Sequence, residues 1–194
     1  MTPKKKHIIV KSFPEQKETH RITCDDGRVI DLFIGRKYGE NEREINPSVC
    51  EVMFKGEDVE QVEIGDLIIV HHNMLKNEAA RVEKNDDHEL YSLYANNMIY
   101  AIIDKDNGTL TPVFGNCIAE RITVEQKSTI VSASPTTEDM KFKITSIPLD
   151  FTDVSNGDTV LCYKYSDYEM VYNFNGRENR AIRIWKDDIL GIYN

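Results

Sequence analysis

Long apolar runs are missing from this sequence. Of its 194 residues, 40% are apolar, but they occur in short runs such as Leu67–Val70, which has the length of a strand. A membrane helix needs about 18 apolar residues or more. The basic residues Lys4–Lys6 are soon followed by Lys11, so no apolar signal region develops after them. We therefore expect no membrane contact, no export and a cytoplasmic protein.

Cysteine is scarce and unpatterned. The four cysteines, Cys24, Cys50, Cys117 and Cys162, form no C-x-x-C pair, and no histidine lies at metal-ligand spacing from them. This pattern indicates neither a metal site nor a disulfide framework, and it fits a reducing compartment in which cysteines serve as small apolar core residues. We expect no metal and no other cofactor.

Positive charge is also in deficit. The 24 Lys and Arg residues face 33 Asp and Glu residues, which gives a net charge of −9. A body of this charge repels phosphate backbones, so we do not expect a nucleic-acid partner. Catalytic signatures are missing as well, because the sequence has no G-x-S-x-G, no glycine-rich phosphate loop and no H-E-x-x-H. The sequence predicts a protein that is not an enzyme and has no catalytic residues.

Helical periodicity is weak throughout the sequence, whereas alternation of apolar and polar residues is common. Short segments rich in Val, Ile and aromatics are bounded by Gly, Asn and Asp. The turns Asp25–Gly27 and Asn175–Gly176 each separate two such segments and predict hairpins. We therefore expect an all-β protein in which any helix is a single turn.

An internal repeat accounts for most of the chain. Glu63–Val70 matches Ser155–Cys162, and both contain a Gly-Asp dipeptide before an apolar run. Asn97–Ile103 likewise matches Asp187–Tyr193 further along. The order of the matching segments is the same in both copies. We expect two tandem domains, 1–108 and 109–194.

The two copies also match near their beginnings and differ in length between the matches. Thr2-Pro3 and Thr111-Pro112 each come a few residues before the first apolar segment of their copy. The first copy is longer than the second, and the extra residues fall mainly within 14–48, where a highly charged segment predicts a surface loop.

The repeated motifs resemble those of the GroES-like co-chaperonin family, whose members carry V-x-x-G-D-x-V, a D-G hairpin and a closing D-I-L-A-V-I. In the second copy these are Val154–Val160, Asn175–Gly176 and Asp188–Ile192. In the first copy they are Val62–Ile68 and Asn97–Ile102, with two aspartates in place of the D-G turn. The resemblance implies two tandem GroES-like small β-barrels with hairpins and little helix.

In that family the closing strand and the opening strand join neighbouring subunits into a ring. The resemblance therefore implies a homo-oligomer, with Ile189, Leu190 and Ile192 as candidate edge residues. From the residues alone, closure of a small barrel is the other use of this strand.

The family's mobile loop docks a short apolar segment on the chaperonin ring. The corresponding candidates are Ile130 and Val131 in the second copy, and Val29 and Ile30 in the first. Burying two such side chains contributes roughly 3 to 5 kcal/mol before the cost of ordering the loop. The alternatives are an edge strand for the first pair and a stable hairpin for the second.

The resemblance implies that the protein docks through loops on a chaperonin ring and assists protein folding by capping the cavity. Nucleotide hydrolysis would then belong to the chaperonin alone. The alternative function is that of an oligomeric structural or scaffold β-barrel protein, a ring or shell component that does not bind a chaperonin.

Overall fold

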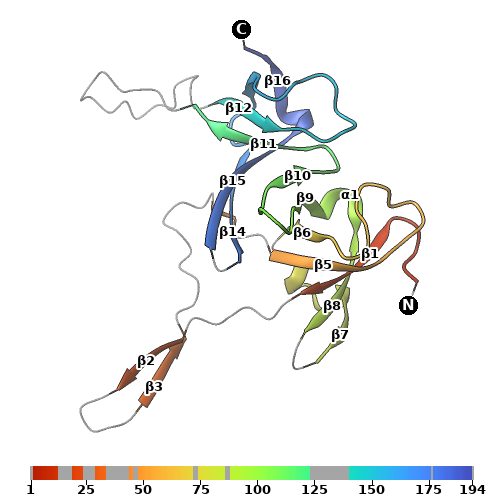
Figure 1. The fold of residues 1–194 in the computed structure, drawn as a ribbon, viewed down its shortest axis with the longest axis vertical. Coiled ribbons are helices and arrows are strands. Elements are labelled where there is room, and N and C mark those ends of the chain that lie inside the picture. Colours follow the sequence, from red (N-terminus) through yellow and green to blue (C-terminus); the bar gives the residue numbers. More distant parts are fainter. Residues whose placement is uncertain are drawn as a thin grey trace.

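Strands make up most of the chain in the computed structural model, which describes residues 2–12, 19–23, 29–33, 44–45, 48–71, 74–85, 88–122, 140–175 and 177–193 (Figure 1). The expected all-β fold with single-turn helices is confirmed. The helices of the described residues are α1 (Ala95–Met98) and the 3-10 turns η1 (Met74–Lys76), η2 (Glu78–Ala80) and η4 (Lys186–Asp188). The strands of the first half are β1 (His7–Ser12), β2 (Thr19–Thr23), β3 (Val29–Phe33), β4 (Glu44–Ile45), β5 (Ser48–Lys55), β6 (Leu67–Val70), β7 (Arg81–Lys84), β8 (Glu89–Tyr94) and β9 (Ile99–Ile103). Those of the second half are β10 (Leu110–Pro112), β11 (Asn116–Arg121), β12 (Lys141–Ser146), β13 (Thr159–Cys162), β14 (Asp167–Phe174), β15 (Arg177–Trp185) and β16 (Ile189–Ile192).

Two sheets share one strand order. The first runs β10-β9-β6-β5-β1-β8-β7, and the second runs β16-β13-β12-β11-β15-β14-β4. Six consecutive strands therefore correspond, from β9 to β7 in the first sheet and from β16 to β14 in the second. All pairs in these sheets are antiparallel except β14 with β4. Within the described residues, no pairing joins the two end strands of either sheet.

The repeated glycines hold the same turn in both halves. Gly65 N–H donates to Val52 O, and Gly157 N–H donates to Ile144 O, both at 2.7 Å. The two glycines have φ of +94° and +96°, a region that side-chain-bearing residues rarely adopt. Glycine at this position is therefore what allows the chain to enter β6 and β13.

The aspartate after each glycine closes the same turn from the other side. Asp66 Oδ2 accepts the Glu63 N–H at 2.7 Å, and Asp158 Oδ2 accepts the Ser155 N–H at 2.9 Å. The short acidic side chain thus satisfies a backbone donor that the turn leaves without a strand partner. The matching dipeptides are structural elements of the repeat.

Each half has a core of its own. The first includes Ile8, Val10 and Val52, and the second includes Phe142 and Ile144, all nearly inaccessible to solvent. Burying side chains of this size contributes about 1.5 to 3 kcal/mol each. Three free cysteines lie in these cores as small apolar residues, as expected, and the fourth, Cys24, is outside the described residues. They are Cys50, Cys117 and Cys162.

The halves are joined by exchanged strands and a shared core. β10 belongs to the second half of the sequence but pairs with β9 of the first sheet. β4 belongs to the first half of the sequence but pairs with β14 of the second sheet. Between the sheets, Ile69, Tyr100 and Ile103 pack with Met170 and Tyr172. The division into 1–108 and 109–194 stays a prediction, and each half supplies one strand to the other half's sheet.

Both expected hairpins are present. β2 and β3 pair antiparallel in a two-stranded sheet of their own, which Figure 1 shows apart from the two larger sheets. β14 and β15 pair along their whole length, with Phe174 opposite Arg177 across the Asn-Gly turn. Asn175 has φ of +49°, as the first residue of a tight hairpin turn requires.

The turn glycines lead to a first prediction. Gly157→Ala should lower the free energy of unfolding by about 1 to 2 kcal/mol, because alanine is strained at positive φ even where space is free. Urea denaturation measures the change. Gly191→Ala is the matched control, since Gly191 also has open space around it and is not at positive φ. Equal stability of the two variants would contradict the assigned role of Gly157.

Candidate functional site at the open edge of the second sheet

Strand β9 of the first sheet is covered by β10, a strand of the second half that ends this sheet. β10 pairs with it, placing Leu110 opposite Ile103 and Pro112 opposite Ala101. The next residue, Val113, donates its N–H to Tyr100 O at 3.2 Å. Ala101 is fully buried, as are nearly all of Tyr100 and Ile103. The backbone groups of β9 therefore have partners along both sides.

The corresponding strand β16 has an open side. Within the described residues it pairs only with β13, and Tyr193 N–H donates to Thr159 O at 2.7 Å just beyond it. Because N–H groups alternate in direction along a strand and that of Tyr193 points to β13, the Ile192 N–H points to the open edge; the pairing with β13 is irregular at Leu190. The Leu190 and Ile192 side chains are 48% and 46% exposed. An unpaired edge of this kind favours pairing with another strand.

A groove of about 330 Å³ lies beside β16. We call it the tail groove; it is lined by Asp150–Val154, Lys186, Asp187 and Ile189–Ile192. Asp187 Oδ2 accepts the Trp185 Nε1–H at 3.0 Å, which holds this carboxylate at the groove. Three carboxylates against one ammonium group make the lining acidic.

In the first half, the groove that corresponds to the tail groove is occupied by residues of the same chain. Val113 is buried against a core that includes Val59, Val62 and Ile99, and Phe114 packs beside it. Val113 and Phe114, which follow β10, thus fill a groove beside β9 and connect the two sheets.

A polar contact completes the filled groove. Phe114 N–H donates to Gln61 Oε1 at 2.6 Å, and Gln61 Nε2 donates to Asp150 Oδ2 at 3.2 Å. One amide side chain of the first half therefore binds both the inserted segment and a turn of the second half.

An arginine clamp fixes the same junction. Arg183 Nε donates to Asn116 Oδ1 at 2.6 Å, and Asn116 Nδ2 donates to Ile99 O and Val113 O. The guanidinium carbon lies 5.0 Å from the ring centre of Tyr100, at cation–π distance. Burial lowers the pKa of Arg183, and the neighbouring phenols partly offset this effect.

The clamp extends to a histidine of the first half. His71 contacts the Tyr100 ring edge-on at a centroid distance of 6.0 Å. Burial, followed by the nearby Arg183 charge, lowers the pKa of His71. The junction therefore favours neutral His71 beside a charged arginine.

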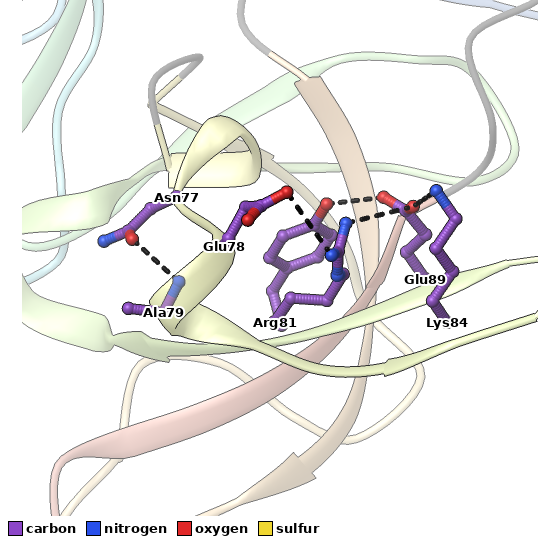
Figure 2. A network of polar contacts seen from close by, with 7 residues as sticks. Asn77, Glu78, Ala79, Arg81, Lys84 and Glu89 are labelled. Atoms are coloured by element: carbon purple, nitrogen blue, oxygen red, sulfur yellow. Dashed lines mark hydrogen bonds and ion pairs between the residues drawn. The ribbon is translucent and has the colours of Figure 1, made fainter.

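The opposite end strand of the first sheet, β7, is guarded by charge. Figure 2 shows Arg81 reaching Glu78 and Glu89, at 3.6 and 3.8 Å, while Lys84 Nζ lies 2.9 Å from Glu89. Tyr91 O–H also donates to Glu89. Charged edge strands resist pairing with other chains. The apolar edge of β16 is therefore the better candidate for association.

The η2 turn beside this network is fixed by its own cap. Asn77 Oδ1 accepts the Ala79 N–H at 3.0 Å (Figure 2). This contact positions Glu78 to meet Arg81 at the start of β7. Local turn chemistry thus places one of the charges that guard the edge.

The residues predicted from the sequence lie in three places. Ile189 packs against the second core, whereas Leu190 and Ile192 occupy the exposed edge of β16. Val29 and Ile30 lie in β3, opposite positions 23 and 22 of the hairpin. Ile130 and Val131 lie outside the described residues. Their proposed roles in association and docking stay predictions.

Sequence reasoning missed the acidic lining of the tail groove. Asp150, Asp153 and Asp187 are spread over two connections of the second half, and no local motif joins them. The available signal was the match of Thr2-Pro3 with Thr111-Pro112, because the second pair leads into the segment that fills the first half's groove.

Comparisons with known proteins assign the chain to no family. No family model matches the chain, and no curated protein matches its sequence. Across the described part of the chain, no group of three or more His, Cys, Asp or Glu residues is placed to hold a metal ion. No helix within those ranges is long and apolar enough to cross a membrane.

The β7 network leads to a pH prediction. Hydrogen bonds from Tyr91 and Lys84 lower the pKa of Glu89, so its folded pKa lies below its unfolded value of about 4.3. The stabilisation is present above that unfolded value and is lost as pH falls through the folded pKa. Glu89→Gln should therefore lower the free energy of unfolding at pH 7, and the difference from wild type should shrink at acidic pH.

Urea denaturation from pH 7 down to about pH 3 measures this difference. Glu83→Gln is the control, since Glu83 is exposed on β7. A wild-type advantage over Glu89→Gln that stayed constant down to the lowest pH would show that the carboxylate does not act through its charge.

Proposed function

We propose that the protein is a co-chaperonin-like oligomer that docks through loops on a chaperonin ring and caps its cavity to assist protein folding. Each half would act as one GroES-like barrel, and the cytoplasm would be its compartment. Binding is non-covalent, so the chain needs neither catalytic residues nor a cofactor, and the chaperonin supplies nucleotide hydrolysis.

The observation that carries the proposal is the pairing of β9 with β10. It joins two sheets of equal strand order head to tail within one chain. The same edge is open at β16, with Leu190 and Ile192 exposed. Repeating the internal junction between chains would extend the series, and closed rings are a common outcome of such head-to-tail contacts.

The β2–β3 hairpin supports docking. It pairs with no other described strand, and an isolated two-stranded hairpin is marginally stable in water. Its register places Ile22 opposite Ile30 and His20 opposite Leu32. A partner surface that packs on this hairpin would supply the stability it lacks. Several weak hairpins held in one ring would bind firmly through effective concentration.

Docking can be tested with a chaperonin ring and ATP. Wild type should co-elute with the ring in size-exclusion chromatography, and Val29→Ser/Ile30→Ser or Ile130→Ser/Val131→Ser should weaken binding on the order of tenfold or more, because apolar contact area is lost. Leu149→Ser is the control, since Leu149 is a fully exposed apolar residue on a turn outside both segments of the sequence. Unaltered elution of both wild-type proteins would exclude chaperonin docking.

A second candidate function is that of a structural or scaffold oligomer, a ring or shell component without chaperonin binding. The apolar edge of β16 favours it specifically, because that edge needs only another copy of the chain. Both candidate functions require an oligomer of this chain, and only the co-chaperonin function also requires a chaperonin ring.

Edge association has its own test. Leu190→Lys/Ile192→Lys should reduce self-association about tenfold or more, because lysine on an edge strand opposes strand pairing. Both side chains are exposed, so the fold should persist. Light scattering after size-exclusion chromatography gives the mass, and far-UV circular dichroism checks the fold. Leu149→Lys/Ile64→Lys is the charge-matched control, because both residues are exposed and lie outside β16. An unchanged mass in the double variant would remove β16 from the interface.

A further inference from the structure

Arg183 lies where the two halves meet, and aromatic rings surround its guanidinium group. On β15 it stands opposite Ile118 of β11 and Tyr168 of β14. The ring centres of Tyr100, Tyr168 and Trp185 lie 5.0, 5.1 and 5.3 Å from the guanidinium carbon, all at cation–π distance. These rings attract the positive charge, but they offer no oxygen to the N–H groups of the guanidinium.

Most hydrogen-bond donors of Arg183 have no acceptor among the described residues. A guanidinium carries five N–H donors in a planar fork. In the described part of the chain only the Nε–H is used, by Asn116 Oδ1 at 2.6 Å. Arg121, by contrast, pairs with the carboxylate of Asp167 at 2.7 Å. The two terminal nitrogens of Arg183, which form the end of the fork, can therefore accept a ligand.

The charge of Arg183 acts on its neighbours. Burial is the main cause of the pKa shifts of His71, Tyr100 and Cys117, lowering the first and raising the other two. The Arg183 charge comes second and acts to lower the pKa of each group. Three groups from both halves thus experience a positive charge at the junction.

Other charges near the guanidinium act in both directions. Asp188 is close enough for Arg183 to lower its pKa, although burial has the larger and opposite effect, and the two side chains form no ion pair. Asp187 is held by the Trp185 Nε1–H, and the Lys186 charge reaches Cys117 as that of Arg183 does. Positive and negative charges are therefore balanced, so a ligand needs directed hydrogen bonds and is not held by net charge alone.

We propose that Arg183 binds a small oxyanion, a carboxylate or a phosphate, through its two terminal nitrogens at the junction of the halves. Both groups present two oxygens at the spacing of the guanidinium fork, and both accept two parallel N–H bonds from arginine. This inference rests on the fold alone and is independent of the chaperonin and scaffold functions.

The position of the site gives the ligand a structural effect. Arg183 belongs to the second half, whereas Tyr100 and His71, which lie beside it, belong to the first. An anion that binds only when these residues are brought together favours the joined state of the two halves. We therefore expect the melting temperature to rise with ligand concentration.

The single tryptophan of the chain reports on the site directly, because Trp185 lies beside the guanidinium. Its fluorescence is measured while sodium phosphate or sodium acetate replaces sodium chloride at a constant ionic strength of about 0.15 M, where the screening length is about 8 Å. We expect a saturable change with a dissociation constant on the order of 1 mM, as for one bidentate arginine contact.

Two variants act in opposite directions. Arg183→Lys should weaken binding about tenfold or more, because an ammonium group lacks the planar fork. Asp188→Asn should tighten it about threefold, because a charge that repels the anion is removed. Arg180→Lys on the same strand and Asp106→Asn on an exposed turn are the matched controls, and neither should change the affinity.

A saturable response to phosphate, to acetate or to both supports the site and shows which group it prefers. Absence of a saturable response to either anion in the wild type overturns the proposal, as does equal affinity in folded Arg183→Lys and wild type. Far-UV circular dichroism checks the fold of that variant. Should Arg183→Lys fail to fold, Asp188→Asn decides, since tighter binding cannot come from unfolding and unchanged binding rejects the site.

Discussion

The need to satisfy the backbone of β9 is the constraint on which the rest of the structure depends. Without β10, β9 would end the first sheet, and one row of its N–H and C=O groups would face outward without a partner. β10 and the Val113 N–H provide the partners, and this pairing buries Tyr100 between the halves. Arg183 and Asn116 can then meet at the junction. The relative placement of the sheets follows from covering one edge.

The same constraint is met in different ways at the other ends of the sheets. β7 carries a network of charges, and β14 receives the short parallel strand β4. β16 has neither device, and its edge residues Leu190 and Ile192 are exposed. Three of these strand edges are thus covered or charged, and the apolar edge of β16 is left exposed. This asymmetry is why assembly is central to the proposed function.

Much of the fold could be predicted from local sequence. The Gly-Asp dipeptides at residues 65 and 157 marked the repeat because positive φ requires glycine there, and Asn175 marked a hairpin for the same reason. β4 and β10 could not be predicted, since strands of two or three residues have no periodicity. The tail groove was equally hidden, because its carboxylates become neighbours only after two distant connections fold together.

The exchange of β4 and β10 makes the two halves one cooperative unit. Unfolding the first half would strip β4 from β14, and unfolding the second would strip β10 from β9 and remove Val113 from the first core. Neither half can open without exposing backbone and apolar surface in the other, so the free-energy cost of opening either one includes part of the other's stability. The stabilities of the two repeated sheets are therefore coupled.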